Sequence, residues 1–290
     1  MYITLHKKFD DRIRVAYSMV EEVDKISDVR HPLVRESLLL TDLNEGIEIT
    51  STADIPGKGT GLGSSSSYTV GLLNALYAYK SIKVDPYKIA SEACEIEIKR
   101  CGEPIGKQDQ FAASFGGLKM YEFMPNETVN VHDIKCSDSF KSKLNNSCIS
   151  FYLGSTRSAS KILEVQTKIS NNEEKKIVLR RMAQIAREFR AGIEDSSFKR
   201  LVELMNENWS LKKTMTKEIS NKYIDEVYSI GMKAGAKAGK LLGAGGGGFI
   251  TFLAPEENHA KIRESLSKLK EVKLEMETKG SQIIYNERVY

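Results

Sequence analysis

Alternation of apolar and polar residues predicts several strands near the start of this chain. The clearest is 47–53, where every second residue is apolar or small and can face a core. Shorter runs at 2–5 and 13–17 flank the turn-like Lys-Phe-Asp-Asp at 8–11, an arrangement that favours a β-hairpin. The first part of the chain is therefore expected to form a sheet.

Helical spacing, with apolar residues three or four positions apart, alternates with these strands. We expect helices over 34–40 and 68–76. Another begins at 85–86, where an aspartate cap precedes a proline at the first helical position. The Cys-Gly pair at 101–102 ends it, so helices and strands are mixed from the start.

Glu97 lies in the apolar stripe of the helix that begins at 85–86, together with Ala93, Cys94 and Cys101. A carboxylate on a buried face is costly unless it is paired or bound to a metal ion. One interpretation makes Glu97 a glutamate at the rim that pairs with a lysine. The apolar stripe favours the other interpretation, a functional carboxylate.

The remainder of the chain continues to mix the two periodicities. The expected strands are 118–123, 149–154, 249–253 and one containing Val272, Leu274 and Met276. The expected helices are 160–170, 173–193, 198–205, 223–234 and 256–270. This pattern predicts an α+β protein, and 290 residues allow two domains, which we place at 1–145 and 146–290.

A glycine loop (residues 56–67), Pro-Gly-Lys-Gly-Thr-Gly-Leu-Gly-Ser-Ser-Ser-Ser, joins the strand at 47–53 to the helix at 68–76. Glycines let backbone N–H groups approach a ligand, Ser64 is a natural N-cap, and a helix N-terminus attracts anions. A serine hydroxyl there can also ligate a magnesium ion that bridges phosphate oxygens. This order predicts a phosphate site rather than a flexible linker.

Composition excludes several other classes of protein. Hydrophobic content of 41% and charged content of 28% are ordinary for a globular protein, and a net charge of +4 is too small to indicate nucleic acid, although it suits a pocket for an anionic substrate. No apolar run is long enough for a membrane span, and no signal-peptide pattern occurs. Four cysteines without a C-x-x-C pair indicate reduced thiols, hence a cytoplasmic protein, and four scattered histidines argue against a zinc site.

Two motifs in this order resemble signatures of the GHMP small-molecule kinases. The glycine loop resembles their second signature, P-x-x-x-G-L-G-S-S, and Lys-Leu-Leu-Gly-Ala-Gly-Gly-Gly-Gly-Phe at 240–249 resembles the third. Within the family the chain is most similar to sugar 1-kinases, above all the D-glycero-D-manno-heptose 7-phosphate kinases. That similarity rests on Gln-Asp-Gln-Phe-Ala-Ala-Ser-Phe-Gly-Gly at 108–117, Ser-Thr-Arg-Ser-Ala-Ser at 155–160, and Trp209 followed by Lys212.

The resemblance implies a fold and a reaction. The N-terminal domain is expected to be ribosomal-S5-like and the C-terminal domain ferredoxin-like. With ATP and Mg²⁺ as cofactors, such an enzyme would phosphorylate the C1 hydroxyl of D-glycero-D-manno-heptose 7-phosphate for nucleotide-activated heptose and for capsule or lipopolysaccharide synthesis. We expect a monomer or homodimer that binds this sugar phosphate and neither nucleic acid nor membrane.

Two alternatives stay open at the level of sequence. A related GHMP kinase could act on fucose, galactose or a non-sugar alcohol. The chain could instead be a catalytically inactive nucleotide-binding regulatory protein, because the family's first signature, a glycine run that ends in Thr-Asp in the sugar kinases, does not occur in it.

The resemblance also assigns roles to individual residues. Asp109, which as a turn aspartate could simply be a cap, matches the proposed catalytic base. Magnesium is expected at Ser65 and Glu97. The expected ATP-binding residues are Pro56, Gly57, Gly59, Gly61, Leu62, Gly63, Ser64, Ser65 and Ser66.

The sugar site is expected to use residues from the C-terminal half. Arg157 could clamp a phosphate, although a plain surface arginine is an equal alternative, and the same holds for Lys212 and Lys213. Trp209 is expected in the core rather than as a platform for the sugar. Seven glycines within 235–248 are hard to explain as purely structural, and the family uses such a loop to buttress the phosphate loop and sugar pocket. The expected substrate-binding residues are Arg157, Lys212, Gly245, Gly246 and Gly247.

Overall fold

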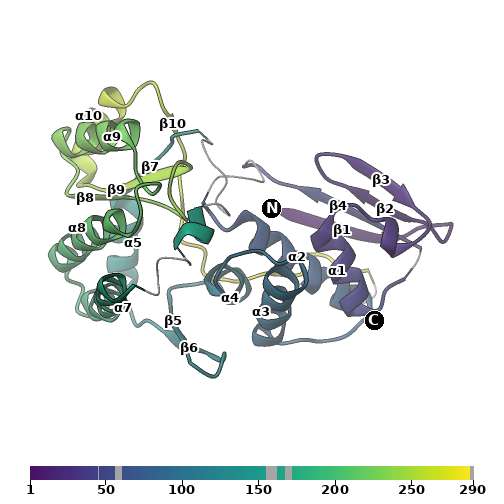
Figure 1. The fold of residues 1–290 in the computed structure, drawn as a ribbon. Helices are drawn as coiled ribbons and strands as arrows, with labels where there is room; N and C mark the ends of the chain where they lie inside the picture. Colours follow the sequence, from purple (N-terminus) through teal and green to yellow (C-terminus); the bar gives the residue numbers. More distant parts are fainter. Residues whose placement is uncertain (45, 56–60, 155–161, 167–171, 288–290) are drawn as a thin grey trace. The chain divides into compact units, whose positions relative to one another are not determined.

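The computed structural model describes residues 1–44, 46–55, 61–154, 162–166 and 172–287 (Figure 1). Contacts divide the chain into two units, the first formed by Met1–Gly57, Gly63–Gly117 and Glu277–Tyr290, and the second by Lys58–Leu62 and Leu118–Met276. The boundary expected at 145/146 is therefore not where the contacts divide the chain. The end of the chain returns to the first unit, where the N–H of Gly117 donates to the carbonyl of Glu277 at 2.9 Å.

The first unit contains a four-stranded sheet in the order β1-β4-β2-β3. Its strands are β1 (Tyr2–Lys7), β2 (Ile13–Ala16), β3 (Val20–Val23) and β4 (Ile47–Thr52). β4 runs antiparallel to β1 and parallel to β2. The hairpin expected between the first two strands is wrong, because β4 lies between them; β2 forms its hairpin with β3, which the sequence did not predict.

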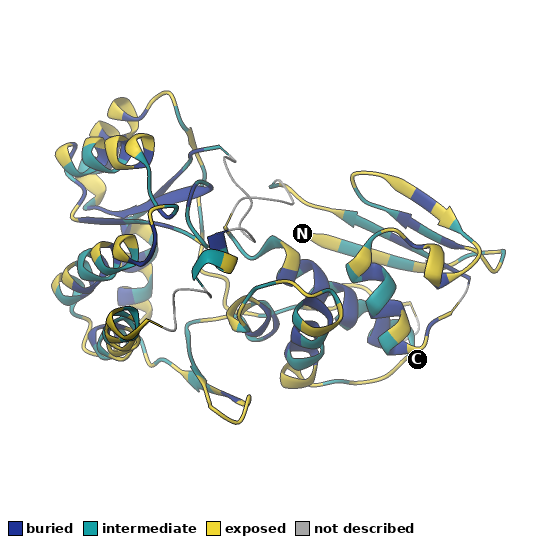
Figure 2. Ribbon diagram, viewed as in Figure 1, coloured by how far each residue is buried: buried dark blue, intermediate teal, exposed yellow. Residues whose placement is uncertain are grey.

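Helices cover one face of this sheet. They are α1 (Pro32–Thr41), α2 (Ser64–Tyr79), α3 (Pro86–Cys94), the π-helix η2 (Glu95–Arg100) and α4 (Gln108–Phe115), with a short 3-10 turn η1 (Ile26–Asp28). Ile47 and Ile49 of β4 are fully buried and pack with Leu38 of α1 and Leu72 of α2. Figure 2 colours the buried residues of these helices and strands dark blue. The carboxylate of Asp85 accepts from the N–H of Lys88 at 2.9 Å, which confirms the predicted cap of α3.

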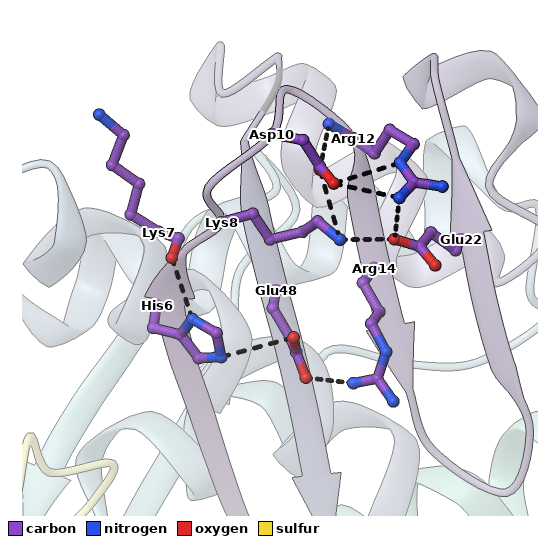
Figure 3. Close-up of polar contacts among 8 residues, drawn as sticks. All are labelled: His6, Lys7, Lys8, Asp10, Arg12, Arg14, Glu22 and Glu48. Atoms are coloured by element: carbon purple, nitrogen blue, oxygen red, sulfur yellow. Dashed lines mark hydrogen bonds and ion pairs between the residues drawn. The ribbon is translucent and has the colours of Figure 1, made fainter.

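Charged side chains from the four strands form ion pairs at one end of the sheet (Figure 3). Arg14 and Glu48 stand opposite each other on β2 and β4 and form an ion pair. Glu22 of β3 pairs with Lys8 at 2.5 Å and with Arg12 at 3.2 Å. Solvent-exposed pairs of this kind each add little stability. They show that the polar positions of the alternating strands face water.

The second unit is built around an antiparallel sheet in the order β10-β7-β9-β8. Its strands are β7 (Cys148–Tyr152), β8 (Ala238–Leu241), β9 (Phe249–Leu253) and β10 (Lys270–Glu271), and a separate hairpin joins β5 (Lys119–Phe123) to β6 (Val129–Asp133). The helices are α5 (Asp138–Ser147), α7 (Glu173–Glu194), α8 (Phe198–Met215), α9 (Lys222–Lys233) and α10 (His259–Ser265), with helical residues at 162–166 and a 3-10 turn η3 (Glu256–Asn258). Trp209 is 1% exposed in the core between them, as expected.

Several boundaries differ from the sequence-based expectations. β8 lies inside the glycine-rich stretch, where Gly239 has a Phe252 carbon 2.6 Å from the position that a Cβ would take. Strand propensity missed it because a small residue there serves packing rather than strand formation. The strand expected around Val272 is limited to Lys270–Glu271, α10 is shorter than expected, and α8 is longer.

Two properties of the chain complete this description. Within the described ranges, the helices are too short or too polar to cross a membrane. All four cysteines carry free thiols, and burial raises the pKa of Cys94 to about 12. The cysteines therefore make no covalent link between elements of the fold.

Candidate active site

The first turn of α2 closes the glycine loop in the first unit. Ser64 was expected as the N-cap, but α2 begins at Ser64 and the cap position is Gly63, whose φ of 66° lies in the left-handed region. Gly63 has no side chain that could cap this helix, and the helix dipole places a partial positive charge at this end, which favours an anionic ligand. Ser65 is exposed and Ser66 is buried in this turn. Pro56, Gly57 and Gly59 lie outside the described residues.

Glu97 is fully buried on the π-helix that continues α3. Its carboxyl group accepts hydrogen bonds from the hydroxyl groups of Ser65 and Ser66 and from the side-chain amide of Gln110. Burial raises its pKa, and these three hydrogen bonds oppose that effect. Because Glu97 is fully buried, the interpretation as a rim glutamate is wrong.

The oxygen atoms around Glu97 fit a magnesium ion. Ser65 Oγ contacts Glu97 Oε1, and Gln110 Oε1 is buried without a hydrogen-bond partner among the described residues. Carboxylate, hydroxyl and amide oxygens are hard donors, and Mg²⁺ needs only one or two protein ligands because waters and phosphate oxygens complete its shell. A cation would also favour the charged form of Glu97. No group of three His, Cys, Asp or Glu side chains suited to a metal ion occurs in the described ranges.

Asp109 lies against the same turn. It stands in the first turn of α4, and a Cβ atom on Gly63 would lie 3.1 Å from Asp109 Oδ2. The cap position of α4 is Lys107, so Asp109 does not cap this helix. Partial removal from water raises the pKa of Asp109, and a hydrogen bond with Gln108 opposes the shift. The carboxylate is thus a somewhat stronger base than usual beside the start of α2.

In the second unit, a C-terminal glycine loop (residues 242–248) joins β8 to β9. The N–H of Gly246 donates to the carbonyl of Ile219 at 3.0 Å, and that of Gly248 donates to the carbonyl of Gly154 at 3.0 Å. A Cβ atom on Gly243 would lie 2.4 Å from the Cα of Gly61, so the two backbones touch. These contacts suit a buttress for the glycine loop. The substrate roles of Gly245, Gly246 and Gly247 stay predictions.

The two lysines near the end of α8 have different surroundings. Lys213 is 3.7 Å from a carboxylate oxygen of Asp225, and its ammonium group lies 5.7 Å from the centroid of the Trp209 ring. Lys212 donates to the carbonyl oxygen of Gly243, and burial together with the charge of Lys240 lowers its pKa to about 8. Lys213 therefore has a structural explanation, whereas Lys212 stays a candidate for substrate binding. Arg157 lies outside the described residues.

Three residues of these sites were not singled out from the sequence. Gln110 holds Glu97, and the Gln-Asp-Gln motif that contains it was a visible signal. Lys240 opens the third signature, and its side chain donates to Asn208 at 3.0 Å. Asn208 precedes Lys212 by one helical turn, so helical spacing could have placed both on one side of α8.

Comparison with protein families gives two matches. The model described as GHMP kinases N terminal domain matches residues 26–117, and that described as GHMP kinases C terminal matches residues 189–271. Together they cover more than half of the chain.

Two curated relatives are similar in sequence. A D-glycero-alpha-D-manno-heptose 7-phosphate kinase from Campylobacter jejuni subsp. jejuni serotype O:2 is 30% identical over 216 residues, covering 74% of this chain and 63% of that protein. A mevalonate kinase from Thermococcus sibiricus is 26% identical over 238 residues, covering 77% of this chain and 66% of that protein. The chain thus spans slightly less than two thirds of the length of each.

A solved structure shares the fold. The crystal structure of a D-glycero-D-manno-heptose 1-phosphate kinase from Bacteriodes thetaiotaomicron has a TM-score of 0.75 and 24% sequence identity, and the match covers 98% of this chain and 87% of that chain. The expected α+β architecture with two domains is therefore confirmed.

Proposed function

The chain belongs to the GHMP kinase family, and from that premise we propose that it is an ATP-dependent sugar kinase. One observation carries the proposal: a buried carboxyl group, Glu97, and a second one, Asp109, both lie against the first turns of α2 that follow the glycine loop. Phosphoryl transfer needs positioned phosphates, a divalent cation and an oriented acceptor hydroxyl. Glu97 suits the divalent cation, and Asp109 suits the acceptor hydroxyl.

In this proposal the nucleotide phosphates bind the glycine loop and the N-terminus of α2. The N–H groups of the first turn and the helix dipole favour the negative charge. Ser65 and Glu97 would hold Mg²⁺, which neutralises charge that develops on the transferred phosphoryl group. Gln110 would keep the carboxylate of Glu97 in place by its hydrogen bond. Pro56, Gly57, Gly59, Gly61 and Leu62 complete the proposed set of nucleotide-binding residues.

Asp109 would take the proton of the acceptor hydroxyl during transfer. Its raised pKa makes the carboxylate more basic, and its contact with Gly63 holds it beside the glycine loop. Positioning and electrostatics would supply the rest of the rate enhancement.

The preferred acceptor is the C1 hydroxyl of D-glycero-D-manno-heptose 7-phosphate. The Campylobacter jejuni relative supports it. Arg157, Lys212 and the glycines 245–247 would bind this sugar phosphate, and the product would supply nucleotide-activated heptose for capsule or lipopolysaccharide synthesis in the cytoplasm. A second candidate, a non-sugar alcohol, is supported by the mevalonate kinase relative.

ATP turnover by the 290-residue chain tests the proposal. ADP release would be measured with heptose 7-phosphate, galactose, fucose and mevalonate, against ATP alone and against the Asp109→Asn variant. Release that depends on heptose 7-phosphate supports the preferred acceptor, and release with mevalonate supports the second candidate. Binding of MgATP without turnover on any acceptor contradicts the proposal and favours an inactive nucleotide-binding protein.

A further inference from the structure

Two lysines of the second unit, Lys212 and Lys240, come from two elements that pack together, α8 and β8. Lys240 of β8 donates a hydrogen bond to the side-chain oxygen of Asn208 on α8 at 3.0 Å. Lys212 stands one helical turn after Asn208, and its positive charge is close enough for that of Lys240 to lower its pKa. Lys212 itself donates to the carbonyl oxygen of Gly243, at the start of the C-terminal glycine loop.

In the part of the chain that the structure describes, this lysine pair (Lys212 and Lys240) has no acidic partner. Among the described residues, no carboxylate pairs with either ammonium group, whereas Lys213 pairs with Asp225, and Arg181 pairs with Glu207 at 2.6 Å. Both lysines are partly withdrawn from water, and burial lowers the pKa of each. Two like charges placed together at the edge of a low-dielectric interior are unfavourable unless an anion joins them.

The hydrogen bonds leave room for such an anion. An ammonium group has three N–H donors, and within the described ranges each lysine uses one of them on a protein acceptor. A tether for the C-terminal glycine loop would explain Lys212 alone. It does not explain a second ammonium group beside it, because Lys240 donates to the helix and not to the loop.

We propose that Lys212 and Lys240 together bind a phosphate group of a substrate, and this inference rests on the proposed kinase function. A phosphate monoester carries close to two negative charges and three acceptor oxygens, which match two ammonium groups with spare donors. The group can come from the phosphorylated acceptor or from the nucleotide, since both carry the same chemistry. If the acceptor supplies the phosphate, the acceptor is a phosphorylated alcohol, the class to which heptose 7-phosphate belongs.

The affinity of this site for a phosphate group should depend on pH. Lys212 must be charged to bind it, so affinity falls as the pH rises through about 8. The charged group that faces Lys212 from β8 is Lys240, the Gly243 contact is an uncharged carbonyl, and Asp225 of α9 is paired with Lys213. Phosphate binding should therefore raise the pKa of Lys212 and take up protons near pH 8.

Calorimetric titration of the full chain tests the site. The ligands are heptose 7-phosphate, unphosphorylated heptose and a non-hydrolysable ATP analogue with Mg²⁺. The variants are Lys212→Met and Lys240→Met, with Lys213→Met as the matched control and thermal unfolding as the check on folding. Loss of a charge-assisted hydrogen bond should weaken binding of a phosphate ligand by about ten- to a hundredfold in the first two variants, and Lys213→Met should bind as the wild type does.

The titrations with different ligands distinguish whether the bound phosphate belongs to the acceptor or to the nucleotide. Weaker binding of heptose 7-phosphate, with heptose and the ATP analogue unchanged, supports the proposal and assigns the phosphate to the acceptor. Weaker binding of the ATP analogue alone supports the site and assigns it to the nucleotide. If both variants bind every ligand as Lys213→Met does, the proposal is overturned.

A second measurement avoids dependence on folding of the variants and on kinase activity. The wild-type chain, labelled with ¹³C at the lysine ε carbons, is titrated with inorganic phosphate. Shifts of the Lys212 and Lys240 signals, with Lys213 unmoved, support the site even if no acceptor is ever phosphorylated; in that case only the proposed function fails. Unmoved Lys212 and Lys240 signals overturn the inference and leave a demonstrated kinase activity untouched.

Discussion

Asp109 lies beside Gly63 at the start of α2, where a Cβ atom on the glycine would lie 3.1 Å from Cβ, Cγ and Oδ2 of the aspartate. The absence of a side chain at position 63 therefore determines where the carboxylate of Asp109 can lie. The same glycine adopts a φ of 66°, which favours glycine over other residues. One residue thus both starts the helix and positions the candidate base.

Replacing Gly63 by alanine should reduce both stability and activity. The left-handed backbone costs about 1–2 kcal/mol for a residue with a Cβ. The new methyl group must also push Asp109 aside. We expect a lower free energy of unfolding in chemical denaturation and a lower kcat in the ADP-release assay.

Gly102→Ala is the matched control for this prediction. Gly102 has a φ of 70°, and apart from its chain neighbours no atom of the described residues lies within 4 Å of the position that its Cβ would take. Its replacement should lower stability by a similar amount through backbone strain alone and leave kcat nearly unchanged. Equal loss of kcat in both variants would contradict a specific role for the contact with Asp109.

Asp109→Asn should lower kcat by about a hundredfold or more, the usual effect of losing a general base. Binding of the nucleotide should change little, because the amide keeps the size of the side chain. Burial raises the pKa of Asp109, so this carboxylate takes up a proton at a higher pH than an ordinary aspartate does. The wild-type rate should fall as the pH is lowered through that value. The variant should lack this acid limb. An unchanged rate would remove Asp109 as the base.

Glu97→Gln should weaken the dependence of nucleotide binding on magnesium. The pKa of Glu97 is higher in the folded state than in the unfolded state. Ionisation of this carboxyl group therefore lowers the stability of the protein as the pH rises from the unfolded-state pKa through the folded-state pKa. Without metal, the variant should therefore be at least as stable as the wild type at neutral pH. Thermal unfolding with and without Mg²⁺ and nucleotide measures both effects.

Ser65→Ala belongs in the same titration. It removes the hydroxyl that contacts Glu97 and leaves the buried carboxylate in place. A smaller loss of magnesium dependence than in Glu97→Gln is expected, because a hydroxyl contributes less than a charge. If the magnesium titration is unaltered in both variants, Ser65 and Glu97 have a purely structural role.

Glu21→Gln should destabilise the first unit by about 1–3 kcal/mol at neutral pH. Glu21 is 7% exposed and accepts hydrogen bonds from the N–H groups of Arg30 at 2.6 Å and His31 at 3.1 Å, and from the hydroxyl of Tyr17 at 2.9 Å. Burial raises its pKa, but these bonds outweigh burial and the pKa is lowered overall. The stabilisation is present above the unfolded-state pKa and is lost as the pH falls through the folded-state value.

Denaturation at neutral and acid pH checks this prediction. The difference in stability between wild type and Glu21→Gln should shrink as the solution becomes acid. Glu22→Gln, at the neighbouring exposed position, is the control and should change stability little. A difference that does not depend on pH would assign the effect of Glu21 to packing rather than to charge.

Local patterns determined much of this protein from the sequence alone. The strand expected at 47–53, which the structure has as Ile47–Thr52, the helix after the glycine loop and the cap at Asp85 were predicted correctly, because each depends on neighbouring residues. The two glycine-rich signatures indicated the family for the same reason, since a phosphate loop is a local arrangement of backbone and serine hydroxyls.

Contacts between distant segments decided the remainder. Only the tertiary structure placed β4 between β1 and β2, moved the cap of α2 from Ser64 to Gly63, and surrounded Glu97 with Ser65 and Gln110. Strand order and the partners of a buried charge follow from which surfaces meet, which no short stretch of sequence encodes. Lys212 and Lys240 illustrate the difference, because each is an ordinary lysine in its own segment and the pair exists only where α8 packs on β8.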